Sequence, residues 1–129
     1  MPMQFDLVSP ERLLASREAD AVTVPGVEGD LTAMPGHAAF LTTLRPGYVQ
    51  VTGGAEAAEF FVTGGFAEIS EAGISVLAER AVPRKDVTRA MLDELAAEVE
   101  KAVESAGEEF RTALALRLND IKVLAGQIG

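Results

Sequence analysis

The sequence holds few residues that could bind a metal ion. His37 is the only histidine, and the chain has no cysteine. A transition-metal site would therefore need carboxylates for all its other ligands, which is an unusual donor set for zinc or copper. We expect no metal site and interpret His37 as a hydrogen-bonded structural or interface residue. The lack of cysteine also excludes a disulfide framework.

Serine and acidic residues form no recognisable catalytic pattern. No serine lies in a G-x-S-x-G turn, the motif that presents the nucleophile of many hydrolases. A triad built from distant segments stays open, because triads assemble in space rather than in sequence. Asp93-Glu94 and Glu108-Glu109 are adjacent pairs, so on a helix their side chains point about 100° apart. We interpret them as solvated helix faces and expect no catalytic residues.

Two glycine-rich segments, residues 26–30 and 64–65, raise the question of a phosphate-binding loop. Neither contains the lysine of a P-loop, and neither opens a helix. In the first segment, Glu28 and Asp30 would repel a phosphate group. We therefore predict turns, in which the glycines adopt positive φ angles.

The charge balance limits the classes of partner. Twenty acidic residues against eleven basic ones give a net charge of −9, which repels nucleic acid and anionic lipid surfaces. No apolar run approaches the roughly 20 residues needed to cross a bilayer. The opening residues lack the basic and apolar regions of a signal peptide. We expect a cytosolic protein that meets a membrane only through another protein.

The pattern of the chain changes near Pro83, from short β-type runs to helical periodicity. Gly53-Gly54 separates two of the runs and predicts a hairpin. Strands this short, recurring about every ten residues, favour a sandwich or flattened barrel of eight to ten strands. No segment resembles a crossover helix, so we do not expect a parallel sheet. The predicted strands are residues 5–9, 21–24, 48–52, 59–63, 66–70 and 74–78.

The second part of the chain predicts an antiparallel helical hairpin. Asp86 is the predicted N-cap of a helix that runs to about Ala106, and Gly107 is its predicted stop. Because the first apolar stripe ends in small alanines, we expect the hairpin to dock on another surface or to move. The stripes are Leu92, Leu95, Val99, Ala102 and Ala106, and then Phe110, Leu114, Leu118, Ile121, Ala125 and Ile128.

Four segments resemble the ε subunit of bacterial F-type ATP synthases. Residues 24–47, VPGVEGDLTAMPGHAAFLTTLRPG, are similar to that family's signature around P-G-H-A. Residues 5–11, 59–68 and 76–78 match in the same order. The matches span most of residues 5–80. The resemblance implies a ten-stranded β-sandwich over residues 1–84, followed by a helix–turn–helix over residues 85–129, in agreement with the periodicity.

The resemblance also implies a function. Members of the family are non-catalytic rotor subunits, located on the cytoplasmic face of the bacterial plasma membrane as part of the complex. Their partners are the γ subunit, the c-ring and the catalytic α and β subunits. The loop that matches Glu28, Gly29 and Asp30 faces the c-ring, and His37 is expected at the same end of the domain, at the interface with the c-ring and γ.

In many members the hairpin inhibits ATP hydrolysis, and some members bind a regulatory ATP through an [IL]-D-x-x-R-A motif. Asp86, Arg89 and Ala90 match that motif here, whereas Lys85 replaces the aliphatic residue. In the second helix, Leu116 and Asp120 occupy positions where ATP-binding members carry arginines. We therefore expect no cofactor, with a regulatory ATP at Asp86 and Arg89 left open.

Two other functions stay open at this point. One is a free-standing β-sandwich adaptor that dimerises through its helical hairpin. The other is a hydrolase with an acidic dyad in the sandwich loops. Copurification with α, β and γ subunits favours the stalk subunit, a lone dimer favours the adaptor, and turnover by the isolated chain favours the hydrolase.

Overall fold

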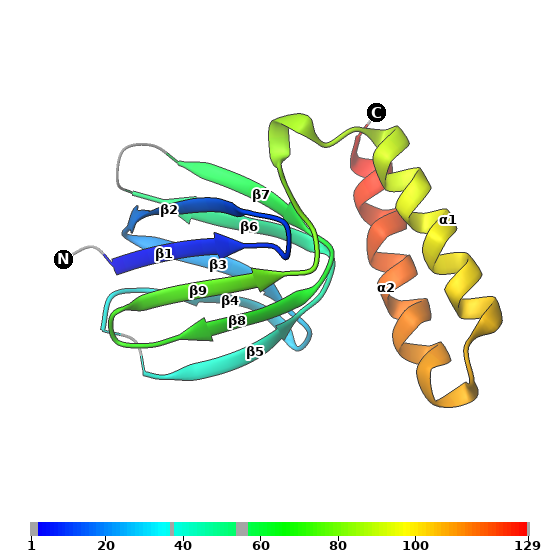
Figure 1. Cartoon of the computed structure of the whole chain (residues 1–129), viewed down its shortest axis with the longest axis horizontal. Coiled ribbons are helices and arrows are strands. Elements are labelled where there is room, and N and C mark those ends of the chain that lie inside the picture. Colours follow the sequence, from blue (N-terminus) through cyan, green and yellow to red (C-terminus); the bar gives the residue numbers. More distant parts are fainter. Residues whose placement is uncertain (1–2, 37, 54–56, 129) are drawn as a thin grey trace. The chain divides into compact units, whose positions relative to one another are not determined.

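The chain divides between Lys85 and Asp86 into two compact units. The computed structural model describes residues 3–36, 38–53 and 57–128. The first unit contains the strands, and the second contains two long helices (Figure 1).

Ten strands make up the first unit within the described residues, as the family resemblance implies. Each strand is short, and turns or brief loops connect them. The strands are β1 (Met3–Val8), β2 (Leu13–Ala19), β3 (Ala21–Gly26), β4 (Gly29–Ala33), β5 (Phe40–Leu44), β6 (Gly47–Thr52), β7 (Ala58–Val62), β8 (Gly65–Ile69), β9 (Gly73–Ala78) and β10 (Ala81–Pro83).

The strands form two layers. The hydrogen-bonded order runs β10-β7-β6-β3-β5-β8-β9-β1-β2, and β4 pairs with the other side of β3. The link between β3 and β5 is a single pair, Gly26 with Leu44. It therefore joins two five-stranded layers, β10-β7-β6-β3-β4 and β5-β8-β9-β1-β2, into a β-sandwich.

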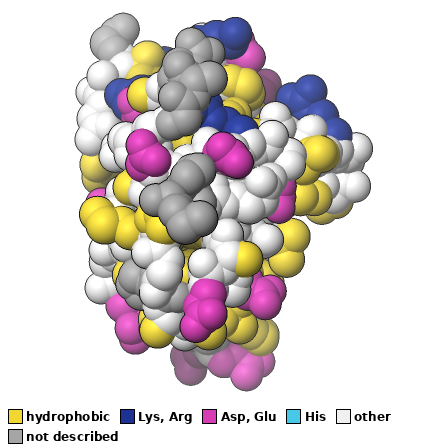
Figure 2. Space-filling model, turned by 90° about the vertical axis from the view of Figure 1, so that its left-hand side faces the viewer, with side chains coloured by type: hydrophobic (Ala, Val, Ile, Leu, Met, Phe, Trp, Pro, Cys, Tyr) yellow, Lys and Arg dark blue, Asp and Glu magenta, His cyan; other side chains and the backbone are white. Residues whose placement is uncertain are grey.

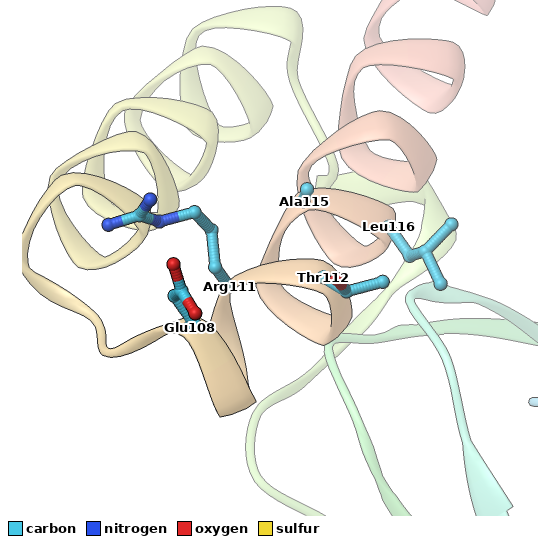
Figure 3. Close-up of a pocket in the computed structure, with 5 residues that line it drawn as sticks. All are labelled: Glu108, Arg111, Thr112, Ala115 and Leu116. Atoms are coloured by element: carbon cyan, nitrogen blue, oxygen red, sulfur yellow. The ribbon is translucent and has the colours of Figure 1, made fainter.

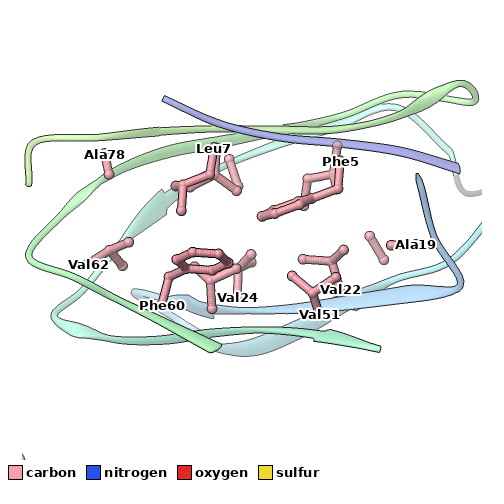
Figure 4. Close-up of a cluster of buried hydrophobic side chains, with 14 of the residues drawn as sticks. Phe5, Leu7, Ala19, Val22, Val24, Val51, Phe60, Val62 and Ala78 are labelled. Atoms are coloured by element: carbon pink, nitrogen blue, oxygen red, sulfur yellow. The ribbon is translucent and has the colours of Figure 1, made fainter. Parts of the chain in front are cut away.

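The hydrophobic core lies between these layers (Figure 4). Phe5 and Leu7 point inward from β1, because side chains alternate across a strand. Val22 and Val24 of β3 and Phe60 of β7 face them from the other layer. Four of these five side chains are fully buried, and Phe60 is 9% exposed. The opening strand predicted at residues 5–9 is therefore confirmed as β1, although it spans Met3–Val8.

Among the described strands, pairing is antiparallel with one exception. The predicted hairpin around Gly53 is β6–β7, with Tyr48 opposite Phe61. However, β1 pairs with β9 in parallel, from Gln4 opposite Gly73 to Val8 opposite Leu77. The described sheet is thus not a parallel one, in agreement with the prediction, although it contains this one parallel ladder. A crossover helix is needed only when parallel neighbours follow each other along the chain, and seven strands separate β1 from β9.

The boundary between the units lies within a short 3-10 turn, Arg84–Asp86, and the second unit contains α1 (Arg89–Ser105) and α2 (Glu108–Gln127). The N-cap of α1 is Thr88, whose Oγ1 accepts a hydrogen bond from the Met91 amide at 3.2 Å. The prediction of Asp86 as the N-cap was wrong, because Asp86 still lies in the 3-10 turn.

The break between the helices lies where the sequence predicts it, but Gly107 has a different role from the predicted one. Ala106, in extended conformation, is the C-cap of α1, and Gly107 is the N-cap of α2 rather than the stop of α1. The side chain of Arg111 donates a hydrogen bond to the Ala106 carbonyl at 3.2 Å. Lys122 and Glu100 form an ion pair at 3.2 Å between the helices.

Burial along the two predicted stripes is uneven. In α1, Leu92 and Leu95 are buried, whereas Ala102 is exposed. In α2, Ile121 is buried, whereas Phe110 near the interhelical turn is 60% exposed. Both stripes are thus exposed near the interhelical turn. The stripe of the first helix ends there in alanines, whose small side chains fill little space between the helices. Among the described residues, neither helix combines the length and apolar character that a membrane span needs.

Candidate functional site

The turn between β3 and β4 presents two of the predicted interface residues. Gly26 pairs with Gly29, so the turn consists of Val27 and Glu28. Gly29 has a φ of 130°, a conformation that favours glycine. A Cβ on Gly26 would lie 2.7 Å from the Gly29 carbonyl oxygen, so this glycine is needed for close approach and not for positive φ. Both glycines are thus required by the tight geometry of the turn.

Backbone hydrogen bonds fasten this turn to neighbouring strands. The Val27 amide donates to the Thr43 carbonyl of β5 at 2.9 Å. The Arg45 amide donates to the Pro25 carbonyl, also at 2.9 Å. Glu28 and Asp30 remain exposed on either side of Gly29. The result is an acidic turn held in a fixed position at the junction of the two layers.

His37 lies outside the described residues. Met34, Pro35 and Gly36 follow β4, and Gly36 has a φ of 81°. Glu28 immediately precedes β4. A strand of five residues spans roughly 16 Å, so β4 separates Glu28 from Pro35. The predicted place of His37 at the same end of the domain as the acidic turn therefore stays a prediction.

The two candidate nucleotide-binding residues lie at the start of the second unit. Asp86 ends the 3-10 turn, and Arg89 is the first residue of α1. Arg89 Nε lies 3.9 Å from Asp93 Oδ2, one helical turn further on, and both side chains are more than half exposed. At that exposure the pair contributes little stability, so the Arg89 guanidinium is accessible to a ligand.

Leu116 and Asp120 of α2, at the positions where the resemblance implies arginines, are not cationic. Leu116 is 63% exposed, and Asp120 is buried at 9% exposure. A shallow hollow on α2 is lined by Glu108, Arg111, Thr112, Ala115 and Leu116 (Figure 3). Among the described lining residues only Arg111 is cationic, and its side chain donates a hydrogen bond to the Ala106 carbonyl. The hollow therefore lacks the paired cations that bind a phosphate group strongly.

Two side-chain clusters on the sandwich were not predicted from the sequence. On β1 and β2, Asp6 Oδ1 accepts hydrogen bonds from Ser16 Oγ at 2.6 Å and from Gln4 Nε2 at 3.1 Å. The Ser16 hydroxyl, and to a lesser extent Gln4, lower the pKa of Asp6, although slight burial opposes the shift. Gln4 and Asp6 are two residues apart on β1, and Ser16 of β2 lies opposite Asp6. The strand register could therefore have revealed the cluster.

The second cluster joins Arg84 to β6 and β7. Arg84 forms an ion pair with Glu59, and its guanidinium carbon lies 4.4 Å from the centroid of the Tyr48 ring. No sequence motif marks these three residues, because their positions become neighbours only through the sheet register.

The described ranges hold no group of three or more His, Cys, Asp or Glu side chains placed to bind a metal ion. Figure 2 shows one face of the molecule, over which acidic side chains are scattered among apolar ones. The candidate site is therefore an exposed acidic turn on a rigid scaffold. The fold and this site define a two-unit module: a β-sandwich with a fixed acidic turn, followed by a helical hairpin.

Comparisons with known proteins give the family. The family described as "ATP synthase, Delta/Epsilon chain, beta-sandwich domain" matches residues 2–84. An ATP synthase epsilon chain from Rhodobacter capsulatus is 51% identical, over 98% of this chain and 96% of the relative. An ATP synthase epsilon chain from Paracoccus denitrificans is 48% identical, over 98% of this chain and 90% of the relative. The chain therefore belongs to the ATP synthase delta/epsilon chain family.

Solved structures show the same fold. A chain in the Euglena gracilis mitochondrial ATP synthase, a structure of OSCP/F1/c-ring, superposes with a TM-score of 0.73. It is 21% identical, and the match covers 98% of this chain and 81% of that one. A chain from the central stalk/c-ring of the Tetrahymena thermophila mitochondrial ATP synthase gives a TM-score of 0.56 at 20% identity. The match covers 67% of this chain and 69% of that one.

Proposed function

We propose that this chain is the ε subunit of the F1 sector of a proton-translocating ATP synthase. In this role it couples rotation of the c-ring, through γ, to ATP synthesis. The observation that carries the proposal is the 51% identity to an ATP synthase epsilon chain over 98% of this sequence. Because that match extends through the helical unit, the proposal covers the whole chain and not only the sandwich.

The chain acts mechanically and not chemically in this proposal. ATP forms on the α and β subunits, and the torque that drives their conformational changes reaches them through γ. The ε subunit is peripheral on the cytoplasmic face of the plasma membrane, where the complex holds it. The acidic net charge of −9 supports attachment through protein partners, because it opposes direct binding to anionic lipid.

The β3–β4 turn is the part of the sandwich that meets the c-ring. Two observations support this assignment: the exposure of Glu28 and Asp30, and the hydrogen bond that fixes Val27 to Thr43. A force-transmitting contact needs a turn that does not yield when it is pushed sideways. The closely packed Gly26 and the backbone bonds supply that stiffness. His37 stays in the proposed interface with the c-ring and γ on sequence grounds.

The helical unit regulates hydrolysis in this proposal, and ATP does not control its position. Asp86 and Arg89 keep part of the family's nucleotide motif. However, the second helix carries Leu116 and Asp120 at the positions expected to hold phosphate-binding arginines. An exposed arginine alone gives weak phosphate affinity, because paired guanidinium contacts provide most of the binding free energy.

Affinity purification of the tagged full-length chain from the cells that express it tests the proposal. Membranes are washed without detergent, and the released complexes are identified by mass spectrometry. We expect the α, β and γ subunits to copurify with the chain. Recovery of a lone dimer would instead support the adaptor function. Hydrolytic turnover by the isolated chain, lost when its acidic residues are replaced, would support the hydrolase.

A further inference from the structure

The segment that follows β10 still contacts β7 through a side chain, one residue beyond the end of the strand. In the β7–β10 ladder, Val82 lies opposite Phe61 and Pro83 opposite Phe60. Continuing this antiparallel register by one residue places Arg84 opposite Glu59. Arg84 and Glu59 do form an ion pair there, although Arg84 belongs to the 3-10 turn. The side chains thus extend the ladder after the backbone pairing has ended.

A second contact holds Arg84 against β6. Its guanidinium carbon lies 4.4 Å from the centroid of the Tyr48 ring, in the range of a cation–π contact. Tyr48 is itself opposite Phe61 on β7, with the rings edge to face at 6.0 Å. Phe61 is fully buried, so it anchors Tyr48. Arg84 is therefore held by side chains from two strands of the sandwich.

The helical unit has its own fixed starting point at Thr88. The Thr88 hydroxyl accepts a hydrogen bond from the Met91 amide at 3.2 Å, and the Thr88 carbonyl accepts one from the Leu92 amide at 3.2 Å. These bonds tie Thr88 to the first turn of α1. Only Lys85, Asp86 and Val87 lie between Thr88 and Arg84, and three residues span at most about 11 Å.

We propose that Arg84, Tyr48 and Glu59 form a latch, and that the link between the two units bends only at Lys85–Val87. The latch fixes one end of this three-residue pivot, and the Thr88 cap fixes the other. Any movement of the helical unit then starts from an unchanged β10. The inference does not rest on the proposed function, since it follows from contacts within the chain.

Amide hydrogen exchange on the full-length chain tests the latch. In Arg84→Ala both contacts are lost, and we expect amides of the β7–β10 ladder to exchange roughly 3- to 30-fold faster. Amides of β3 and β8 should not change. Tyr48→Phe keeps the ring and should behave as the unsubstituted chain, whereas Glu59→Gln should give a smaller increase. Lys85→Ala is the matched control for loss of a neighbouring cation, and we expect no change in β10.

Distance measurements test the position of the pivot. Because the chain has no cysteine, Glu68→Cys on β8 and Glu98→Cys on α1 allow two spin labels at exposed positions. We expect Arg84→Ala to broaden the distribution of label-to-label distances, because the bending segment then extends into β10. Lys85→Ala should leave the width unchanged. Unchanged exchange in β10 together with an unchanged width in Arg84→Ala would overturn the proposal, whatever partner the protein binds.

Discussion

At the scale of single residues, the network around Asp6 makes the outer face of β1–β2 sensitive to pH. The Ser16 hydroxyl and then the Gln4 amide donate to the Asp6 carboxylate and lower its pKa in the folded state. A lowered folded-state pKa means that the group stabilises the fold above its unfolded-state pKa of about 3.9. That contribution is lost as the pH falls through the folded-state pKa.

We therefore predict that Ser16→Ala raises the pKa of Asp6 toward its ordinary value, measured by NMR titration of the carboxyl resonance. The difference in melting temperature between Ser16→Ala and the unsubstituted chain should shrink as the pH falls through the folded-state pKa of Asp6. The effect should be small, because the site is largely exposed and solvent screens it. A pKa for Asp6 that does not move in Ser16→Ala would rule out this hydrogen bond as the cause.

The glycines show how far residue-level prediction from sequence reaches. Turn formation explains Gly29 and Gly53, which have positive φ angles. Gly73 is different, because a Cβ there would lie 2.0 Å from the Gln4 carbonyl oxygen of the parallel neighbour β1. Such close approach depends on which strand becomes the neighbour. The sequence predicts the turns but not this packing.

At the scale of elements, the start of α1 separates two N-cap hypotheses. The structure assigns the cap to Thr88, which bonds the Met91 amide, and places Asp86 outside the helix. We predict that Thr88→Ala lowers the stability of the helical unit by about 1 kcal/mol, as measured by amide exchange in the first turn. Asp86→Ala is the matched control and should leave that exchange unchanged. The reverse order of effects would restore Asp86 as the cap.

Strands were predicted where apolar residues alternate strongly, as in β1, β3 and β6. The pattern did not predict β2, β4, β5 or β10. β2 is the last strand in the pairing order and includes Ser16, Arg17 and Glu18. β10 has only three residues and ends in Pro83. Edge and very short strands bury little side-chain surface, so the period-2 signal is weak there. The site's acidic turn was predicted, but its attachment to β5 was not.

The second helix gives a prediction about nucleotide binding. Each missing guanidinium contact to phosphate would contribute about 1.5–3 kcal/mol, so two losses weaken binding by about two to four orders of magnitude. We predict that calorimetric titration of the full-length chain shows no saturation by ATP at micromolar concentrations. A micromolar dissociation constant that Arg89→Ala abolishes would show that other residues replace the arginines absent at 116 and 120.

At the scale of the whole molecule, the acidic turn should matter for coupling and not for folding. We predict that Asp30→Lys weakens proton-driven ATP synthesis in the assembled complex, because it reverses a charge at the proposed contact with the c-ring. The free energy of unfolding should change by less than about 0.5 kcal/mol, since Asp30 is exposed. Glu71→Lys, in the exposed β8–β9 turn, makes the same charge change and should preserve coupling. A large loss of stability with normal synthesis would instead make Asp30 a structural residue.

Reconstitution tests the proposed coupling role most directly. Membrane vesicles that carry a Rhodobacter capsulatus ATP synthase depleted of its epsilon chain would receive the purified full-length chain. ATP synthesis would then be measured under an imposed proton gradient, with a boiled sample of the chain as the control. We predict that the folded chain binds the complex and restores proton-driven synthesis. A folded chain that fails to bind, or that binds without restoring synthesis, would contradict the account.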